Sequence, residues 1–313
     1  MVEIKDLVKK YGNKYAVDGI SFKIEEGEIV GFLGPNGAGK STTMNIITGY
    51  LSATSGTVSI DGKDIFESPI EVKRLIGFLP EQPPLYIDMT VMEYLSFVFD
   101  LKSCTFNKKK HLEEICDLVK IADVKNRLIK NLSKGYRQRV GIGGALVGNP
   151  RFIIFDEPTV GLDPVQIIEI RNLIRNLGKK HTVILSTHIL SEVQAICDRI
   201  IIINEGKIIA DEKTSELNKV VGQTSKLRVK VSGPMKEVSN LLNSIHGVKR
   251  VTCDGVKEGD AFTFIIESTP TIDIRKMMFR ALADKGWPLM GMEGVEAELE
   301  DLFIKLINSR KEH

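Results

Sequence analysis

Gly34-Pro35-Asn36-Gly37-Ala38-Gly39-Lys40-Ser41-Thr42 is a glycine-rich segment that fits a phosphate-binding loop: a glycine, four residues, and then Gly-Lys-Ser. The apolar run 29–33 before it predicts a buried strand, and residues 41–47 predict the start of a helix. Glycines let successive backbone N–H groups turn toward a phosphate, and a helix N-terminus adds partial positive charge. Lys40 is expected to reach the β- and γ-phosphates of a nucleotide, and the Ser41 hydroxyl to hold Mg²⁺. The segment therefore predicts a nucleotide site rather than a turn that binds nothing.

Two carboxylates follow another apolar run. Residues 152–155 are continuously apolar, which is typical of a strand buried on both faces, and Asp156 and Glu157 come directly after them. Ligands of open α/β sheets bind beyond the carboxyl ends of the strands. Asp156 can hold Mg²⁺ directly or through water, and Glu157 can activate the attacking water. Together with the phosphate loop, the pair predicts nucleotide hydrolysis rather than an ordinary surface turn.

Leu132-Ser133-Lys134-Gly135-Tyr136-Arg137-Gln138 resembles the signature motif of the ATP-binding cassette (ABC) family, Leu-Ser-x-Gly-x-x-Gln. Lys134 stands where a second glycine is most frequent, but Gly135 remains for a close approach to phosphate. The resemblance covers about residues 1–217. Its other motifs are the adenine-stacking Tyr11, the Q-loop Gln82, the D-loop Gly161-Leu162-Asp163 and the switch His188. The resemblance implies an ATPase that uses ATP and Mg²⁺.

The resemblance also implies that a complete site needs two chains. In the family, the signature motif contacts the γ-phosphate bound to the opposite subunit, so Ser133 and Gly135 are expected to serve a partner's ATP. Gln138 and Asp163 belong to the same nucleotide-binding set, and His188 is expected to touch the γ-phosphate as the second catalytic residue beside Glu157. We expect a homodimer with ATP at its interface; a heterodimer with a related subunit is the alternative.

The assignments of Tyr11 and Gln82 each have an alternative. Tyr15 lies close to Tyr11 in the sequence and could take its place against adenine, although Tyr11 matches the family position. Gln82 is expected either to sense the γ-phosphate and pass a loop movement to a docking surface, or to act only as a Mg²⁺ ligand.

Composition narrows the class of protein. The 313 residues contain 43 Lys and Arg against 41 Asp and Glu, which argues against a protein that coats nucleic acid. The four cysteines form no CxxC pair and are typical of reduced thiols in the cytosol. The sequence has no signal-peptide pattern, and no apolar run approaches the roughly 20 residues that cross a bilayer. We therefore expect a cytoplasmic protein, peripheral on the cytoplasmic face of the cell membrane through a separate permease subunit, with no nucleic-acid partner.

Residues from about 89 to 130 predict the helical subdomain of a cassette, because apolar residues recur there at helical spacing. In the family, the surface near the junction with the Q-loop receives a short helix of the membrane partner. An apolar docking groove would suit the side chains of Leu85, Tyr86, Met89 and Tyr94. The same side chains could equally fill the core of the subdomain.

A domain boundary is expected between residues 217 and 218. Beyond it, the sequence predicts strands and helices in the order β-α-β-β-α-β, followed by a terminal helix with an apolar face at Leu299, Leu302, Phe303 and Leu306. This order favours a ferredoxin-like domain over residues 218–313. No catalytic cluster is evident in it, so regulation, dimer support and partner contact all stay open.

The predicted fold is therefore an α/β P-loop ATPase cassette with a helical subdomain, followed by a small α+β (ferredoxin-like) C-terminal domain. The chain resembles the ATP-binding subunits of bacterial ABC-2-type exporters and, more loosely through residues 79–86, gliding-motility-type members. The alternatives are an importer ATPase subunit and a soluble ABC ATPase acting on ribosomes or DNA. The single cassette and the lack of an inserted coiled coil argue against the soluble classes.

Overall fold

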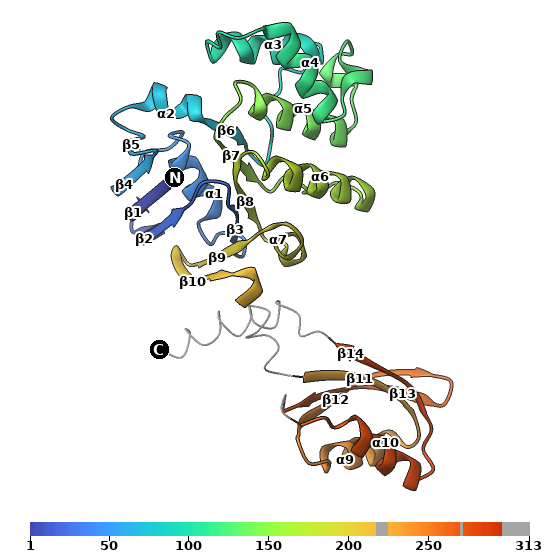
Figure 1. The fold of residues 1–313 in the computed structure, drawn as a ribbon. Coiled ribbons are helices and arrows are strands. Elements are labelled where there is room, and N and C mark those ends of the chain that lie inside the picture. The colour runs from blue at the N-terminus through green and yellow to red at the C-terminus, as the bar shows by residue number, and fades with distance from the viewer. Residues whose placement is uncertain (217–224, 270–271, 296–313) are drawn as a thin grey trace. The chain divides into compact units, whose positions relative to one another are not determined.

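The computed structural model of the chain describes residues 1–216, 225–269 and 272–295. The chain divides between Thr214 and Ser215 into two units, which are described separately here (Figure 1). The boundary expected between residues 217 and 218 lies outside the described residues.

An antiparallel sheet opens the first unit, with strand order β2-β1-β4-β5. Its strands are β1 (Val2–Tyr11), β2 (Lys14–Ile24), β4 (Ser55–Ile60) and β5 (Lys63–Asp64). In the second half of β2, buried and solvent-facing residues alternate, which is the pattern of a strand with one face on a core. Tyr11 pairs with Lys14 across the turn between β1 and β2, so this hairpin end carries both side chains.

The second sheet has the order β10-β9-β3-β8-β7-β6. Its strands are β3 (Ile29–Leu33), β6 (Ile76–Leu79), β7 (Phe152–Asp156), β8 (Thr182–Thr187), β9 (Arg199–Asn204) and β10 (Lys207–Lys213). All pairings are parallel except that of β10 with β9. Because the carboxyl ends of parallel strands share one edge, the segments after β3, β6, β7 and β8 come together there.

Helix α1 (Lys40–Ile47) lies between the two sheets (Figure 1). One apolar core contains Met44, Ile46 and Ile47 of α1 together with residues of both sheets, such as Phe22 of β2 and Phe32 of β3. The other helices of this α/β part are α2 (Pro69–Leu75), α6 (Pro164–Leu177) and α7 (Leu190–Ile196). Burial of α1 on both sides fixes the loop that precedes it.

The helical subdomain consists of α3 (Val91–Leu101), α4 (Lys108–Leu118), two short 3₁₀ turns (Ala122–Val124 and Ile129–Asn131) and α5 (Lys134–Leu146) (Figure 1). Helix α3 begins with a capping box in which Thr90 and Glu93 satisfy each other's backbone N–H groups. Glycines in α5 allow close contact with other elements. A Cβ atom on Gly141 would lie 2.7 Å from Leu79 Cδ1 and 2.9 Å from Pro83 Cβ.

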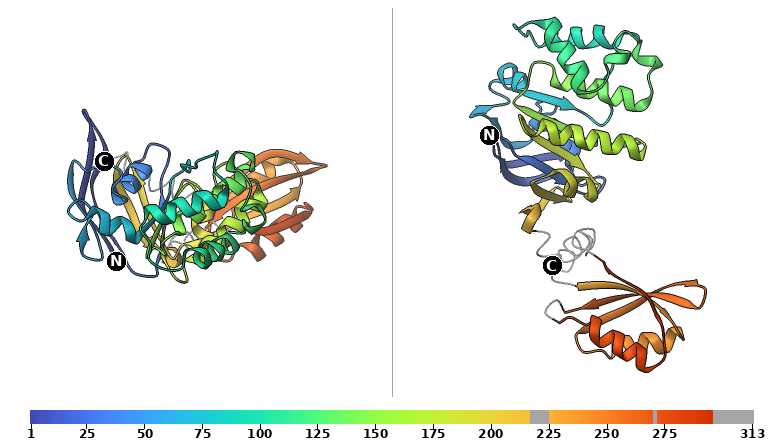
Figure 2. Two further views of the ribbon diagram at one scale, coloured as in Figure 1. Left: turned by 90° about the horizontal axis from the view of Figure 1, so that it is seen from above. Right: turned by 45° about the vertical axis from the view of Figure 1, so that its right-hand side comes forward.

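The second unit has the predicted β-α-β-β-α-β order. Its elements are β11 (Ser225–Ser232), α9 (Met235–Asn243), β12 (Val248–Glu258), β13 (Ala261–Ser268), α10 (Arg275–Asp284) and β14 (Leu289–Val295). The sheet is antiparallel with the order β12-β13-β11-β14, the arrangement of a ferredoxin-like fold. Both helices lie on one face of this sheet (Figure 2). The helix predicted around Leu299–Leu306 lies outside the described residues.

Candidate active site

The loop between β3 and α1 is held in a form that requires glycine. Gly39, the residue before α1, has φ of +110°, and a Cβ atom there would lie 2.4 Å from the Ala16 carbonyl oxygen. The first turn of a helix has backbone N–H groups without intrahelical partners, and these are the groups that a phosphate accepts from. The structure thus forms the predicted phosphate loop, with its donors at the carboxyl end of β3.

Lys40 is buried at the centre of this loop, with 6% of its surface exposed. Its ammonium donates hydrogen bonds to the carbonyl oxygens of Gly34 at 2.8 Å and Pro35 at 3.3 Å. The same Nζ atom lies 3.6 Å from Glu157 Oε1. A buried charge is retained only when it is paired and hydrogen-bonded, and Lys40 meets both conditions.

Glu157 and His188 meet beside Lys40. The Nδ1 atom of His188 lies 2.9 Å from both carboxylate oxygens of Glu157. Glu157 is itself in the left-handed region, with φ of +49°, and its backbone N–H donates to the Ser186 carbonyl oxygen at 2.8 Å. A non-glycine residue in this region costs stability and is typical of functional sites. The backbone therefore turns sharply after β7 and brings the carboxylate to the phosphate loop.

Asp156 lies behind this pair. Its side chain is almost fully buried and accepts a hydrogen bond from the Ser186 hydroxyl at 2.7 Å. The Asp156 carboxylate and the Ser41 hydroxyl are hard oxygen donors of the kind that Mg²⁺ prefers. Mg²⁺ is usually held by one or two carboxylates and otherwise by phosphate oxygens and water, so these two side chains fit such an ion. No group of three or more His, Cys, Asp or Glu side chains that could hold a metal is present among the described residues.

These residues surround a cavity of about 500 Å³. Its lining contains nine of the predicted site residues: Tyr11, Asn36, Gly37, Gly39, Lys40, Ser41, Thr42, Glu157 and His188. Gly34, Pro35 and Ala38 of the loop lie outside the lining, and so does the predicted metal ligand Asp156. Lys14, Ala16, Glu81 and Val160 line the cavity without having been expected from the sequence.

Of the two neighbouring tyrosines, Tyr11 lies on the cavity and Tyr15 does not. Both rings are about half exposed, and each has a lysine above it: Lys9 Nζ is 5.2 Å from the Tyr11 ring centre, and Lys10 Nζ is 4.9 Å from that of Tyr15. The hairpin separates the two side chains: Tyr11 pairs with Lys14 and Tyr15 with Lys10, and successive residues of a strand point to opposite faces.

Glu81 and Gln82 differ in the cavities that they line. Glu81 lines the 500 Å³ cavity beside Lys40, and Gln82 does not; both line a neighbouring cavity of about 360 Å³ together with Lys134, Arg137 and Gln138. Glu81 and Val160 line both cavities. A carboxylate of the β6 exit, rather than the predicted amide, therefore faces the phosphate loop. The role of Gln82 as a metal ligand or sensor stays a prediction.

The remaining predicted residues do not line the phosphate-loop cavity. Ser133 is exposed and caps α5, accepting from the Tyr136 N–H at 3.4 Å, and Asp163 caps α6 by accepting from Gln166 N–H at 2.9 Å. Gly135 contacts the Gln166 side chain closely, since a Cβ atom there would lie 2.5 Å from its Oε1. Buried Gln138 donates to the Pro158 carbonyl oxygen at 2.8 Å.

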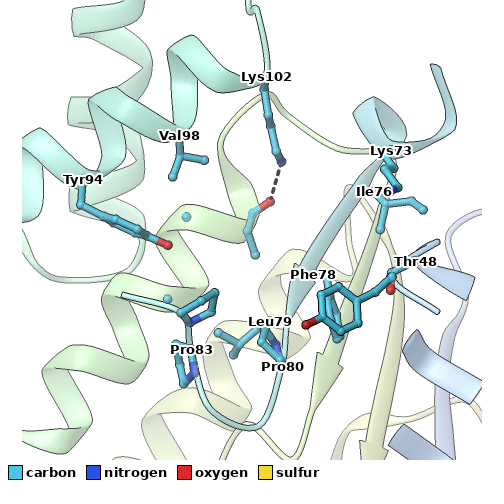
Figure 3. Close-up of a pocket in the computed structure, with 15 residues that line it drawn as sticks. Thr48, Lys73, Ile76, Phe78, Leu79, Pro80, Pro83, Tyr94, Val98 and Lys102 are labelled. Atoms are coloured by element: carbon cyan, nitrogen blue, oxygen red, sulfur yellow. Dashed lines mark hydrogen bonds between the residues drawn. The ribbon is translucent and has the colours of Figure 1, made fainter. Parts of the chain in front are cut away.

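A further cavity of about 300 Å³ lies between β6 and the helices α3 and α5 (Figure 3). We call it the subdomain groove; its lining includes Phe78, Leu79, Pro80, Pro83, Tyr94, Val98, Lys73 and Lys102. Of the four side chains expected to form a docking surface, Tyr94 lines the groove, with 6% of its surface exposed, whereas Leu85, Tyr86 and Met89 do not. The Lys102 ammonium donates to the carbonyl oxygens of Val147 at 2.7 Å and Ala145 at 3.5 Å, and burial lowers its pKa to about 8.

The fold and this site define a P-loop ATPase: a phosphate loop after β3, a carboxylate after β7 and a histidine after β8 meet at one edge of a parallel sheet. Residues 17–160 match the family model described as ABC transporter. A bacitracin transport ATP-binding protein of Bacillus licheniformis is 38% identical over 221 residues, which cover 70% of this chain and 72% of that protein. An uncharacterised ABC transporter ATP-binding protein of Bacillus subtilis is 31% identical over 99% of this chain and 100% of its own length.

A solved dimeric ATP-binding cassette, in a post-hydrolysis state with ADP and phosphate, is 30% identical to the chain. It superposes with a TM-score of 0.63 and covers 68% of this chain and 99% of its own. The chain belongs to the family of ABC transporter ATP-binding proteins, as its signature motif predicted. In the described part of the chain, no helix is both long enough and apolar enough to span a bilayer.

Proposed function

We propose that the chain is the ATP-hydrolysing subunit of an ABC-2-type exporter, and that it works as a homodimer on a separate membrane subunit. The observation that carries the catalytic part is the contact of Lys40, Glu157 and His188 beside the phosphate loop. A cation for the γ-phosphate, a carboxylate for the water and a histidine next to that carboxylate are the groups that ATP hydrolysis needs.

In this proposal, the phosphate loop from Gly34 to Thr42 holds the phosphates of ATP through its N–H groups and Lys40, and the Tyr11 ring stacks on adenine. Ser41 and Asp156 would hold Mg²⁺, and Glu81, which lines the cavity beside Ser41, would be a third candidate ligand. When bound, the ion neutralises negative charge on the β- and γ-phosphates.

Glu157 acts as the general base and accepts the proton of the attacking water. The contact with His188 Nδ1 and the sharp backbone turn at Glu157, with φ of +49°, position the carboxylate for this role. Lys40, which donates to the loop carbonyls and lies 3.6 Å from Glu157, moves its hydrogen bonds to the γ-phosphate when ATP enters. His188 then holds the γ-phosphate in line with the water.

The separation of the signature residues from the cavity supports the proposed dimer. Ser133 is exposed at the start of α5 and does not line the cavity of its own chain. In a symmetric dimer, Ser133 and Gly135 of each subunit would donate to the ATP on the other, so that two nucleotides are enclosed. Gln138 and Asp163 support this surface by fastening α5 to Pro158 and by capping α6.

Export as the direction of transport is supported by relatives. The similar proteins include a bacitracin transport ATP-binding protein and a linearmycin resistance ATP-binding protein, the latter 35% identical over 254 residues. Resistance to a toxic compound through transport requires that the compound leave the cell.

The subdomain groove is the part of the chain best suited to receive a segment of the membrane subunit. It has an apolar lining from β6, α3 and α5, and its only charged lining residues in the described chain are Lys73 and Lys102. A short amphipathic helix would bury its apolar face there, and this contact would hold the chain on the cytoplasmic face of the cell membrane.

Light scattering on Glu157→Gln with ATP and Mg²⁺ tests the dimer, which should have twice the mass of the nucleotide-free chain. A monomer at saturating ATP and high protein concentration would contradict the homodimer. Docking is tested by purifying the tagged chain from detergent-solubilised membranes. Val98→Glu in the groove should abolish copurification of the membrane subunit, whereas Leu118→Glu on the exposed surface of α4 should not. Binding of a substrate-binding protein to the complex would point to an importer instead.

A further inference from the structure

A carboxylate that does not line the cavity joins the two loops of the site from behind. Glu192 lies in the first turn of α7 with 1% of its surface exposed. Its Oε1 atom accepts from the Thr159 hydroxyl at 2.6 Å, and its Oε2 atom accepts from the Thr187 hydroxyl at 3.1 Å. The two threonines are also buried. A buried carboxylate is costly unless such donors satisfy it, so the three side chains stabilise one another's positions.

The two threonines belong to the two catalytic loops. Thr159 follows Glu157 by two residues in the segment after β7, and Thr187 immediately precedes His188 at the end of β8. Thr187 is fixed further, because its hydroxyl accepts from the Ile189 N–H at 3.1 Å. The two loops are therefore joined twice. On the cavity side Glu157 contacts His188, and behind the cavity Glu192 joins Thr159 to Thr187.

Glu192 also reaches the helix that follows the D-loop residues. The Nη2 atom of Arg171 on α6 lies 3.6 Å from Glu192 Oε1 and 3.5 Å from the Ser191 hydroxyl. Asp163 caps the start of α6, so Arg171 connects Glu192 to the helix that begins at the D-loop. The carboxylate thus contacts three segments: the loop of Glu157, the loop of His188, and the helix after the D-loop.

We infer that Glu192 is a positioning residue for ATP hydrolysis, which sets the spacing of Glu157 and His188 and links that spacing to α6. The inference rests on the catalytic roles proposed above for those two residues. It assigns Glu192 no contact with nucleotide, because its side chain does not line the cavity. Loss of its hydrogen bonds should therefore lower kcat and leave ATP affinity unchanged, since misplacing a catalytic group by about 1 Å can cost about 100-fold in rate.

The matched pair Thr159→Val and Thr159→Ser gives the sharpest test. Valine has the shape of threonine without the hydroxyl, and serine keeps the hydroxyl. We expect Thr159→Val to lower kcat about 10- to 100-fold, with ATP affinity within about threefold of wild type, and Thr159→Ser to retain most of the wild-type kcat. Glu192→Gln should lower kcat in the same way. In the double variant, Thr159→Val should lower kcat much less than it does in the wild-type background, because both changes remove one shared contact.

A purely structural role would give another result. Thr159→Val and Glu192→Gln would then lower the melting temperature, but the folded proteins would hydrolyse ATP at the wild-type kcat, and that outcome would overturn the inference. Glu157→Gln is measured alongside as the reference. If that variant turned over ATP at the wild-type rate, the proposed function itself would be wrong, and the inference would fall with it.

Discussion

The imidazole Nδ1 of His188 lies 2.9 Å from both carboxylate oxygens of Glu157, a residue 31 positions earlier in the chain. The contact exists because β7 and β8 are parallel neighbours that end at the same edge, with Asp156 paired to Ser186. Lys40 reaches the same carboxylate from the next strand exit, after β3. Three separate strand exits therefore bring these three side chains together in the candidate site.

Glu157→Gln should abolish most hydrolysis and retain nucleotide binding. The amide keeps the shape of the side chain and can still contact Lys40 and His188, but it cannot accept a proton from water. We expect the rate of phosphate release to fall about 100-fold or more. Calorimetry should show ATP affinity within a few-fold of wild type. Hydrolysis at the wild-type rate would remove Glu157 from the mechanism.

Lys40→Ala should weaken binding itself. A hydrogen bond to a charged group contributes about 1.5–3 kcal/mol, so the Kd for ATP should rise about tenfold or more. Lys10→Ala is the control, because this lysine lies above Tyr15 outside the cavity. An ATP affinity that is the same in the two variants would show that Lys40 stays on the loop carbonyls when ATP binds.

Glu81 and Gln82 can be separated by metal titration. Glu81 lines the phosphate-loop cavity, where its carboxylate can attract a Mg²⁺ ion that binds beside the phosphates. Glu81→Gln should therefore raise the Mg²⁺ concentration needed for ATP binding about tenfold, measured by calorimetry without reference to turnover. Gln82→Ala should leave this requirement unchanged. The reverse pattern would support Gln82 as the ligand and assign Glu81 to the cavity wall alone.

Lys102 should make stability depend on pH in a defined window. Burial lowers its folded-state pKa from 10.5 to about 8, so between these values the unfolded chain binds a proton that the folded chain has released. The free energy of unfolding therefore rises with pH between about 8 and 10.5. Below about pH 8 the ammonium is charged in both states, and the full cost of burying it is present. The unfolding free energy of wild type relative to Lys102→Met should increase from pH 8 to 10 by at most about 1.4 kcal/mol per pH unit. Lys73→Met, a change of an exposed lysine, is the control. The same change of unfolding free energy with pH relative to both variants would contradict the lowered pKa of Lys102.

The parts of the site that depend on local sequence could be predicted from it. The phosphate loop needs only the glycine spacing and the strand and helix on either side, so the sequence alone predicts its position at Gly34 to Thr42. The strand exits at Glu157 and His188 were also predictable, because a continuous apolar run ending in a polar residue marks the carboxyl end of a buried parallel strand. The ferredoxin-like order of the second unit followed from the alternation of strand and helix periods.

Residues whose role depends on the path of a loop could not be predicted in the same way. Whether Glu81 or Gln82 lines the phosphate-loop cavity depends on how the chain bends after Pro80, and the local sequence does not specify that bend. Glu192 gave no signal, since a single glutamate at the start of a helix is an ordinary first-turn residue. Its partners, Thr159 and Thr187, are apart in the sequence and meet only through the pairing of β7 and β8.

The glycines of α5 have a mechanical consequence. Gly141 lies so close to Leu79 and Pro83 that no side chain fits between the helix and the β6 exit, and Gly144 is equally close to the Tyr94 hydroxyl. Because these surfaces are in direct contact, we expect a movement of α5 to displace the chain around Glu81. A tilt of this helix that carried Ser133 toward a second subunit would displace Glu81 at the same time. The contact of Ser133 with the ATP of the second subunit and the position of Glu81 in its own subunit would then change together.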